Sequence, residues 1–414
     1  MKRYKRLDWK KILALPLFFE KYEKKTKNAL KSVVLELLYL SPNQFDFIQK
    51  EKSDTLFFCA SGYHRADHLK NFMKVYECCP CADALVGKNF VEHENPYAIH
   101  WKNLIRYLGK SVGWFVMAVK RGLKFSAFIH IWPNLIEIDS LIGIISELPL
   151  QRYKRLVVYF DGWPTDCFMV QLFKESGKVT YTLQHGTFAR GIDNFKNTDE
   201  YGFELKVSTA DFFLAWNKYT VQEAEVMGLD TYRFRILGMP KFIGVKQGDF
   251  HKKATRKFGV VLNWNANSQQ NIALVKVANQ IAGKIGFQYI LKYHPTDKGI
   301  EYDAYVSKGL CRGVICGRTT TLEEYIEQVD FSIVGNSSML LELLWMGSSI
   351  YHYFEPGQYD KYQSVAEISF SDINGFEDIF DLNAEDLNEI RSRICGPTNP
   401  EEQYKNFFEK ECLS

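Results

Sequence analysis

The stretch LVVYFDGWPTDCFMVQLFKESGKVTYTLQHGTF, residues 156–188, decides what we expect of the fold. The apolar run Leu156–Phe160 predicts a buried strand, the spacing in Phe168–Ser176 predicts a helix, and Val179–Leu183 predicts a second strand. This order indicates a parallel strand-helix-strand unit. The triplet Gln184-His185-Gly186 follows the second strand, at the edge where open parallel sheets bind ligands.

Strand and helix patterns alternate on both sides of this unit. Upstream, TLFFC predicts a strand that ends at Cys59, with a helix from Ala66. Downstream, FGVVLNW (258–264) starts a second series, which continues with strands at 288–293 and 331–334. We therefore expect an α/β protein with two Rossmann-like, doubly wound domains that face a cleft. The predicted boundaries are 1–242, 257–375 and, for C-terminal helices that return to the first domain, 376–414.

The composition bounds the class of protein. A chain of 414 residues suits two domains, and 46% hydrophobic with 24% charged residues is typical of soluble globular proteins. We find neither a signal-peptide pattern nor an apolar stretch long enough to span a membrane. Nine irregularly spaced cysteines predict reduced thiols in a cytoplasm. The pair Cys78 and Cys81 lacks a second pair at zinc-finger spacing, so we expect no metal site.

The N-terminal leader is strongly basic. Residues 1–31 hold eleven Lys or Arg against three acidic residues, and Trp9 and Leu13 lie among them. This pattern indicates either a segment that lies on an anionic membrane surface or a solvated helix. We therefore expect a cytoplasmic protein, peripheral on the inner face of the cell membrane in the first case. Nothing in the pattern indicates a nucleic-acid partner.

The string LKYHP (291–295) predicts polar groups at a strand end in the second domain. His294 ends the predicted strand, and Pro295 turns the chain away from the sheet. Lys292 lies two residues earlier and hence on the same side of the strand. These residues are candidates for contact with the phosphate of a bound nucleotide.

A second polar string, Asn336-Ser337-Ser338, opens the predicted helix 339–346. Backbone N–H groups at a helix start favour phosphate, and Ser hydroxyls add donors. Glu342 lies one turn into this helix, where a carboxylate can accept two ribose hydroxyls. An ordinary N-cap and a solvent-facing Glu would give the same sequence pattern.

Two residues of the first domain are candidate general bases. His185 has a side chain that exchanges protons near neutral pH, so it can take a proton from an acceptor hydroxyl. Asp161, which follows the preceding strand in YFDGWP, is the rival, although Asp before Gly is also a common turn former. His64 and Arg65 follow the first strand and are candidates for acceptor binding or a plain polar helix start.

The order LQHGTF, GMPKF, KYHP and GNSSMLLELLWMG resembles bacterial GT-B transferases of surface-polysaccharide assembly. This broad group includes capsule and lipopolysaccharide glycosyltransferases, Kdo transferases and CDP-glycerol glycerophosphotransferases. The resemblance covers Leu156 to Tyr353. It implies a catalytic role for His185 and contacts of His294, Ser337 and Ser338 with the donor's nucleotide and phosphate.

No Asp-x-Asp metal motif stands at the predicted strand ends, so we expect a metal-independent enzyme without a bound cofactor. The resemblance implies that it would move a sugar or a polyol phosphate from a nucleotide-activated donor to an oligosaccharide or lipid-linked acceptor, with CMP or CDP donors slightly favoured over UDP. The strings FDG, HP and SS also look similar to motifs of bacterial sialyltransferases, but Phe160 stands where a second acidic residue is usual. A nucleotide-sugar 2-epimerase and a non-catalytic assembly protein would share the same two-domain fold.

Overall fold

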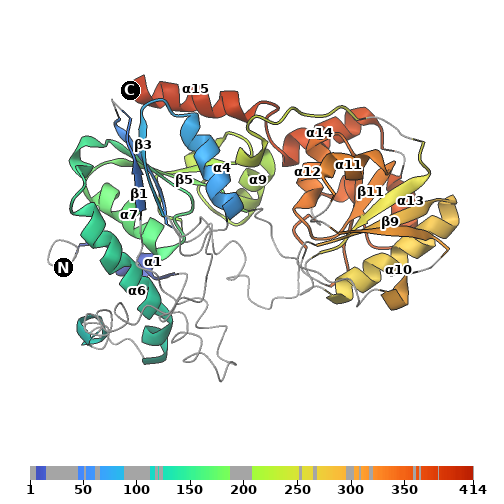
Figure 1. Ribbon diagram of the computed structural model, residues 1–414, viewed down its shortest axis with the longest axis horizontal. Helices are drawn as coiled ribbons and strands as arrows, with labels where there is room; N and C mark the ends of the chain where they lie inside the picture. The colour runs from blue at the N-terminus through green and yellow to red at the C-terminus, as the bar shows by residue number, and fades with distance from the viewer. Residues whose placement is uncertain are drawn as a thin grey trace.

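A computed structural model gives the structure of the protein. It describes residues 6–14, 45–50, 53–60, 66–87, 112–116, 120, 125–186, 208–250, 254–263, 268–294, 303–306, 309–316, 320–357, 360–362, 365–380 and 382–413. The described elements form two α/β domains that lie side by side (Figure 1).

The first domain is built on a seven-stranded sheet with the order β1-β3-β2-β4-β5-β6-β7. All neighbouring strands are parallel except β1, which pairs antiparallel with β3. The strands are β1 (Phe45–Ile48), β2 (Thr55–Cys59), β3 (Ala82–Gly87), β4 (Arg155–Val158), β5 (Val179–Leu183), β6 (Phe212–Ala215) and β7 (Phe234–Ile236). Every residue of β2, β3 and β4 is buried, as expected for parallel strands covered on both faces.

The second domain is built on a six-stranded sheet with the order β10-β9-β8-β11-β12-β13, and all of its strands are parallel. The strands are β8 (Lys257–Val261), β9 (Gln288–Tyr293), β10 (Cys311–Cys316), β11 (Phe331–Val334), β12 (Ser349–Tyr353) and β13 (Ser369–Phe370). The chain adds strands to one side of β8 and then to the other, which is the doubly wound arrangement. The predicted fold class is therefore confirmed.

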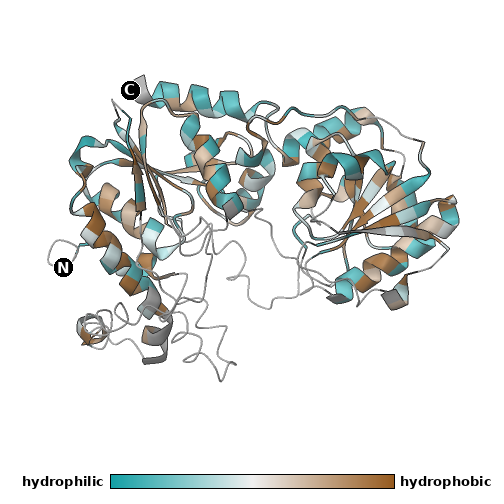
Figure 2. Ribbon diagram, viewed as in Figure 1, coloured by the Kyte–Doolittle hydropathy of each residue, from teal (hydrophilic) through white to brown (hydrophobic). Residues whose placement is uncertain are grey.

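Helices cover the two sheets. They are α1 (Trp9–Ile12), α4 (Ala66–Glu77), α6 (Phe125–Ile145), α7 (Pro164–Glu175), α9 (Lys218–Val226), α10 (Ser268–Ile285), α11 (Leu322–Glu327), α12 (Met339–Trp345), α13 (Ile373–Ile379), α14 (Ala384–Ile394) and α15 (Pro400–Leu413). The central strands are mainly hydrophobic, whereas α15 is mainly hydrophilic (Figure 2). Helix α7 begins four residues before the predicted start at Phe168, because proline is well suited to the first helical turn.

The last helix packs against the first domain. The Phe408 ring lies 5.6 Å from that of Phe57 in β2, and the Tyr404 hydroxyl donates to the Gly238 carbonyl at 3.1 Å. The polar segment after β7 leads from the first domain to the second. There the Gly248 N–H donates to the Trp345 carbonyl of α12 at 3.0 Å. The chain thus crosses between the domains twice, along the upper side in Figure 1.

The described part of the basic leader has an apolar side that is already covered. Ile12 and Leu13 are buried in the core of the first domain, and the Trp9 ring lies 5.5 Å from that of Trp114. Lys10 and Lys11 are exposed. For Trp9 and Leu13 this differs from the expectation that the apolar residues of the leader face a membrane, and within residues 6–14 it leaves only the charged side available. No helix in the described ranges has the length and apolar character needed to cross a membrane.

Cys81 departs from the expectation of reduced thiols. Cys81 is disulfide-bonded, whereas six other described cysteines, Cys78 and Cys79 among them, are free. Burial raises the pKa of the Cys78 and Cys79 thiols to about 11. Because a raised thiol pKa favours the neutral form, these two groups are uncharged at neutral pH.

Candidate functional site

The first domain presents its candidate residues at the carboxyl ends of its parallel strands. The direction of strand addition reverses between β2 and β4, and this switch point is where open parallel sheets bind ligands. His64 and Arg65, which follow β2, lie outside the described residues. The segment Phe160–Gly162 follows β4, and His185 follows the neighbouring strand β5. Two of the predicted residues, Asp161 and His185, thus come from adjacent strand ends.

The His185 imidazole packs against an aromatic ring. Its centroid lies 3.9 Å from that of Phe160, and the two planes make an angle of 34°. Phe160 is fully buried, whereas His185 is half-buried. Gly162 leaves room for the Phe160 ring, since a Cβ atom there would lie 2.3 Å from the ring's Cζ. The string FDG therefore supports the imidazole through its phenylalanine and its glycine.

Gln184 holds the turn that carries His185. Its Oε1 accepts a hydrogen bond from the Trp216 N–H at 2.7 Å, and its Nε2 donates to the Gly186 carbonyl at 2.7 Å. Its own N–H donates to the Leu214 carbonyl at 3.1 Å. The buried amide therefore links the end of β5 to the end of β6 and restricts where His185 lies. Nothing in the sequence indicated this role for Gln184, because two of its partners, Leu214 and Trp216, lie about 30 residues away in the chain.

Asp161 has a different environment from the one expected for a base that faces a cleft. Its side chain has no exposed surface, and its Oδ2 accepts hydrogen bonds from the N–H groups of Thr209 and Ala210 and from the Ser208 hydroxyl. Its N–H donates to the Thr182 hydroxyl at 3.0 Å. The carboxylate thus holds the segment that leads into β6. Its Oδ1 is also buried and accepts no hydrogen bond from the described residues, so the whole carboxylate is closed to solvent in this structure.

In the second domain, three adjacent strand ends carry polar residues. His294 follows β9, Asn263 follows β8, and Asn336 follows β11. His294 and the Asn336 string follow strands that are not neighbours, because β8 lies between β9 and β11. Their backbones are therefore about 10 Å apart, which is two strand spacings. His294 is half-buried, and Pro295 lies outside the described residues.

The remaining donor-side candidates differ in exposure. Lys292 is buried, and its ammonium lies 5.6 Å from the centroid of the Tyr325 ring. The Ser337 hydroxyl accepts a hydrogen bond from the Met339 N–H at 3.3 Å, so it caps the start of α12. Ser338 is exposed and makes no such cap bond. Helix α12 has seven residues, one fewer than predicted.

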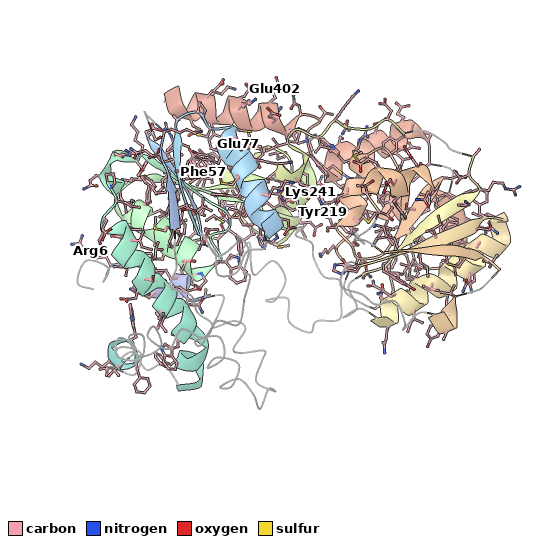
Figure 3. All side chains as sticks on the ribbon, viewed as in Figure 1. Arg6, Phe57, Glu77, Tyr219, Lys241 and Glu402 are labelled. Carbon is pink, nitrogen blue, oxygen red and sulfur yellow. The ribbon has the colours of Figure 1, made fainter. Side chains whose placement is uncertain are left out.

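Glu342 forms an ion pair between the domains. Its Oε1 lies 2.6 Å from the Lys241 Nζ, and Lys241 belongs to the GMPKF string that follows β7. Figure 3 shows Lys241 on the side of the first domain that faces the second. One of the two oxygens expected to accept ribose hydroxyls is therefore already paired. The pair depends on contact between the domains, which sequence spacing does not reveal.

Asn263 is a candidate that sequence reasoning missed. It lies beside the switch point between β8 and β11, where ligands are expected. Its Nδ2 donates to Gln270 at 2.7 Å, while its Oδ1 is buried and accepts no hydrogen bond from the described residues. Gly335 of the next strand end approaches closely, since a Cβ there would lie 2.8 Å from that Nδ2. The signal was available: Asn263 is the first polar residue after the first strand of a doubly wound series.

The two-domain architecture is similar to that of solved structures. No protein-family model and no curated protein matches the chain. The structure of S. aureus MnaA with UDP matches with a TM-score of 0.51 at 10% identity, over 88% of this chain and 97% of that chain. A Listeria monocytogenes protein described as a UDP-N-acetylglucosamine 2-epimerase matches with a TM-score of 0.51 at 9% identity, over 87% and 97%. At such identity the similarity shows the fold, which is the two-domain GT-B type.

Proposed function

We propose that the protein is a glycosyltransferase of cell-surface polysaccharide assembly. It would transfer a sugar or a polyol phosphate from a nucleotide-activated donor to a growing polysaccharide or a lipid-linked acceptor. The observation that carries this proposal is the placement of His185, which Phe160 and Gln184 hold at a strand end of the first domain. The resemblance of the four motifs to surface-polysaccharide transferases supports it.

The proposed reaction needs one base and one stabilised leaving group. His185 removes the proton from an acceptor hydroxyl, and the oxygen attacks the donor's anomeric carbon, or its phosphorus when a polyol phosphate is transferred. The bond from that atom to the nucleotide's phosphate oxygen breaks, and the nucleotide leaves with the electron pair. Donors placed at the developing negative charge stabilise the transition state. His294 and the serines after β11 are the groups proposed for this task.

Replacing His294 with alanine, or Ser337 and Ser338 together with alanine, should weaken nucleotide binding about tenfold or more. The reason is that a hydrogen bond to a charged group contributes on the order of 1.5 to 3 kcal/mol. Isothermal titration calorimetry measures the change. Wild-type affinity in variants that remain folded would remove these residues from the donor site.

Cytidine nucleotides should stabilise the protein against heat. CMP or CDP at 100 times its Kd would add about 2.7 kcal/mol to the free energy of unfolding, because it binds only the folded state. Thermal denaturation with CMP, CDP, UDP and GDP compares the bases directly. The motif resemblance favours cytidine, whereas the match to a structure that contains UDP favours uridine. Stabilisation by UDP alone would contradict the cytidine expectation.

A nucleotide-sugar 2-epimerase is the second candidate, because a protein described as a 2-epimerase shares the architecture over most of its length. The products distinguish the two reactions. An epimerase converts the nucleotide sugar alone, without an acceptor, and releases no nucleotide in proportion to product. A transferase releases one nucleotide for each acceptor modified. Mass spectrometry of both products, with and without an acceptor oligosaccharide, decides between them.

A lipid-linked acceptor would bring the enzyme to an anionic membrane surface. The exposed side of the leader, with Arg6, Lys10 and Lys11, is suited to electrostatic contact. Its apolar side packs in the core, so we propose surface attraction without insertion of α1. Such an attraction weakens as salt is added, since exposed charges are screened.

A further inference from the structure

A buried polar network lies in the second domain, near the carboxyl end of β12. His352 in β12 and Asp360 are buried, and the His352 Nε2 lies 2.9 Å from the Asp360 Oδ1. The His352 Nδ1 lies 2.9 Å from the Ser369 hydroxyl oxygen. Asp360 Oδ1 also accepts a hydrogen bond from the Tyr362 N–H at 2.8 Å. The Nε2–Oδ1 contact is within ion-pair distance but outside hydrogen-bond geometry. Buried polar groups are costly unless they are paired, and apolar residues of similar volume would often be at least as stable.

The network extends to the switch point between β8 and β11. Asp360 Oδ2 accepts a hydrogen bond from the Gln270 Nε2 at 3.4 Å, and Gln270 Oε1 accepts from the Asn263 Nδ2 at 2.7 Å. The three side chains are buried. Asn263 therefore has a defined orientation, with its Oδ1 beside Gly335 at the end of β11.

Asp360 also positions a backbone segment that contacts both domains. The Lys361 N–H donates to the Asn336 Oδ1 at 3.3 Å, so the segment holds the first residue of the Asn-Ser-Ser string. The Lys361 carbonyl accepts a hydrogen bond from the Tyr219 hydroxyl of α9 at 2.8 Å. Figure 3 shows Tyr219, like Lys241, where the first domain approaches the second. Both neighbours of the switch point, Asn263 and Asn336, are thus connected to Asp360.

We propose that Asp360 and His352 are positioning residues for the donor nucleotide, a role that rests on the proposed function. They orient Asn263 through Gln270, and they orient Asn336 through the Lys361 backbone. A nucleoside mono- or diphosphate bound at the switch point then meets side chains that are already in place. Preorganised groups bind more tightly because little conformational freedom remains to be lost on binding.

The test compares Asp360→Ala, Asp360→Asn and Asp330→Asn. Asp330 accepts hydrogen bonds from the Thr255 hydroxyl, the Thr255 N–H and the Arg256 N–H at the opposite, amino edge of the same sheet. Asp330→Asn is therefore a matched control for loss of a structural carboxylate in this domain. The probe is whichever of CMP, CDP, UDP and GDP binds the wild type most tightly, and calorimetry measures its Kd.

We expect Asp360→Ala to raise the nucleotide Kd about tenfold or more, since Gln270 and the Lys361 backbone lose the group that orients them toward Asn263 and Asn336. Asp360→Asn keeps the shape and one acceptor oxygen, so its Kd should lie between those of wild type and Asp360→Ala. Asp330→Asn should lower the unfolding temperature and leave the Kd within a few-fold of wild type. A change in Kd without a matching change in Asp330→Asn therefore distinguishes a positioning role from a general loss of stability.

Three outcomes would contradict the positioning role. If the wild type binds none of the four nucleotides, the proposed function and the positioning role both fail. If the wild type binds but both Asp360 variants keep its Kd, the positioning role alone fails. An equal loss of affinity in Asp330→Asn also overturns it, because the effect would then be structural. If Asp360→Ala does not fold, the nucleotide Kd of Asp360→Asn, measured below its unfolding temperature, tests the positioning role.

Discussion

Replacing His185 with alanine should lower kcat by about 100- to 10,000-fold, because general-base catalysis contributes that much. The nucleotide Kd should stay within a few-fold of wild type, since the donor-side residues lie on the second domain. The free energy of unfolding should change less than for a core substitution, because His185 is half-buried. Steady-state kinetics with saturating donor and acceptor, together with calorimetry, measure these quantities.

Asp161→Asn is the matched comparison for this prediction. Its carboxylate is buried and holds the segment 208–210, so the substitution should lower the free energy of unfolding while kcat per folded molecule stays within a few-fold. A kcat in His185→Ala within a few-fold of wild type would show that His185 is not the base. A large loss of kcat in a fully folded Asp161→Asn variant would move the role to Asp161.

Replacing Gly259 with alanine should destabilise the second domain by about 1 to 3 kcal/mol or more, as overpacked cores do. A Cβ atom at this position in β8 would lie 1.7 Å from the Tyr325 hydroxyl and 2.5 Å from the ring's Cζ. Tyr325 is fully buried and its hydroxyl lies 3.1 Å from the Ser332 hydroxyl oxygen, so the ring has little room to move. Chemical denaturation of the purified protein measures the loss.

Two further variants control for the glycine substitution itself. Gly143 in α6 has no atom within 4 Å of an added Cβ, so Gly143→Ala should stabilise the protein by up to about 1 kcal/mol through helix propensity. Tyr325→Phe in the Gly259→Ala background removes the closest atom and should restore part of the stability. Equal stability of Gly259→Ala and wild type would mean that β8 and α11 pack differently from this structure.

The elements of the fold could be predicted where the pattern is local. Strand β5 ends at Leu183 as predicted, and the described helix α4, Ala66–Glu77, lies where a helix was predicted. Strand β12 was not predicted, because its short run SIYHY contains a polar residue, His352. That histidine is acceptable in a buried strand because Asp360 and Ser369 pair with it, and neither partner is visible in a local window.

The sequence by itself determined the class of fold and the strand ends that carry polar groups. Apolar runs, helical spacing and turn residues are local signals, and a parallel strand-helix-strand unit places His185 and His294 at carboxyl ends whatever the strand order. This is why the triplet that contains His185 and the string that contains Asn336 were both identified from the residues alone.

Only the tertiary structure decided which of these groups meet. Strand order places β8 between β9 and β11 and so brings Asn263 to the switch point. Burial encloses Asp161 among donors from residues 208–210, and contact between the domains pairs Glu342 with Lys241. These outcomes depend on hydrogen bonds and packing between residues far apart in the chain. Local periodicity reports the conformation of a segment and carries no information about the segment it will contact.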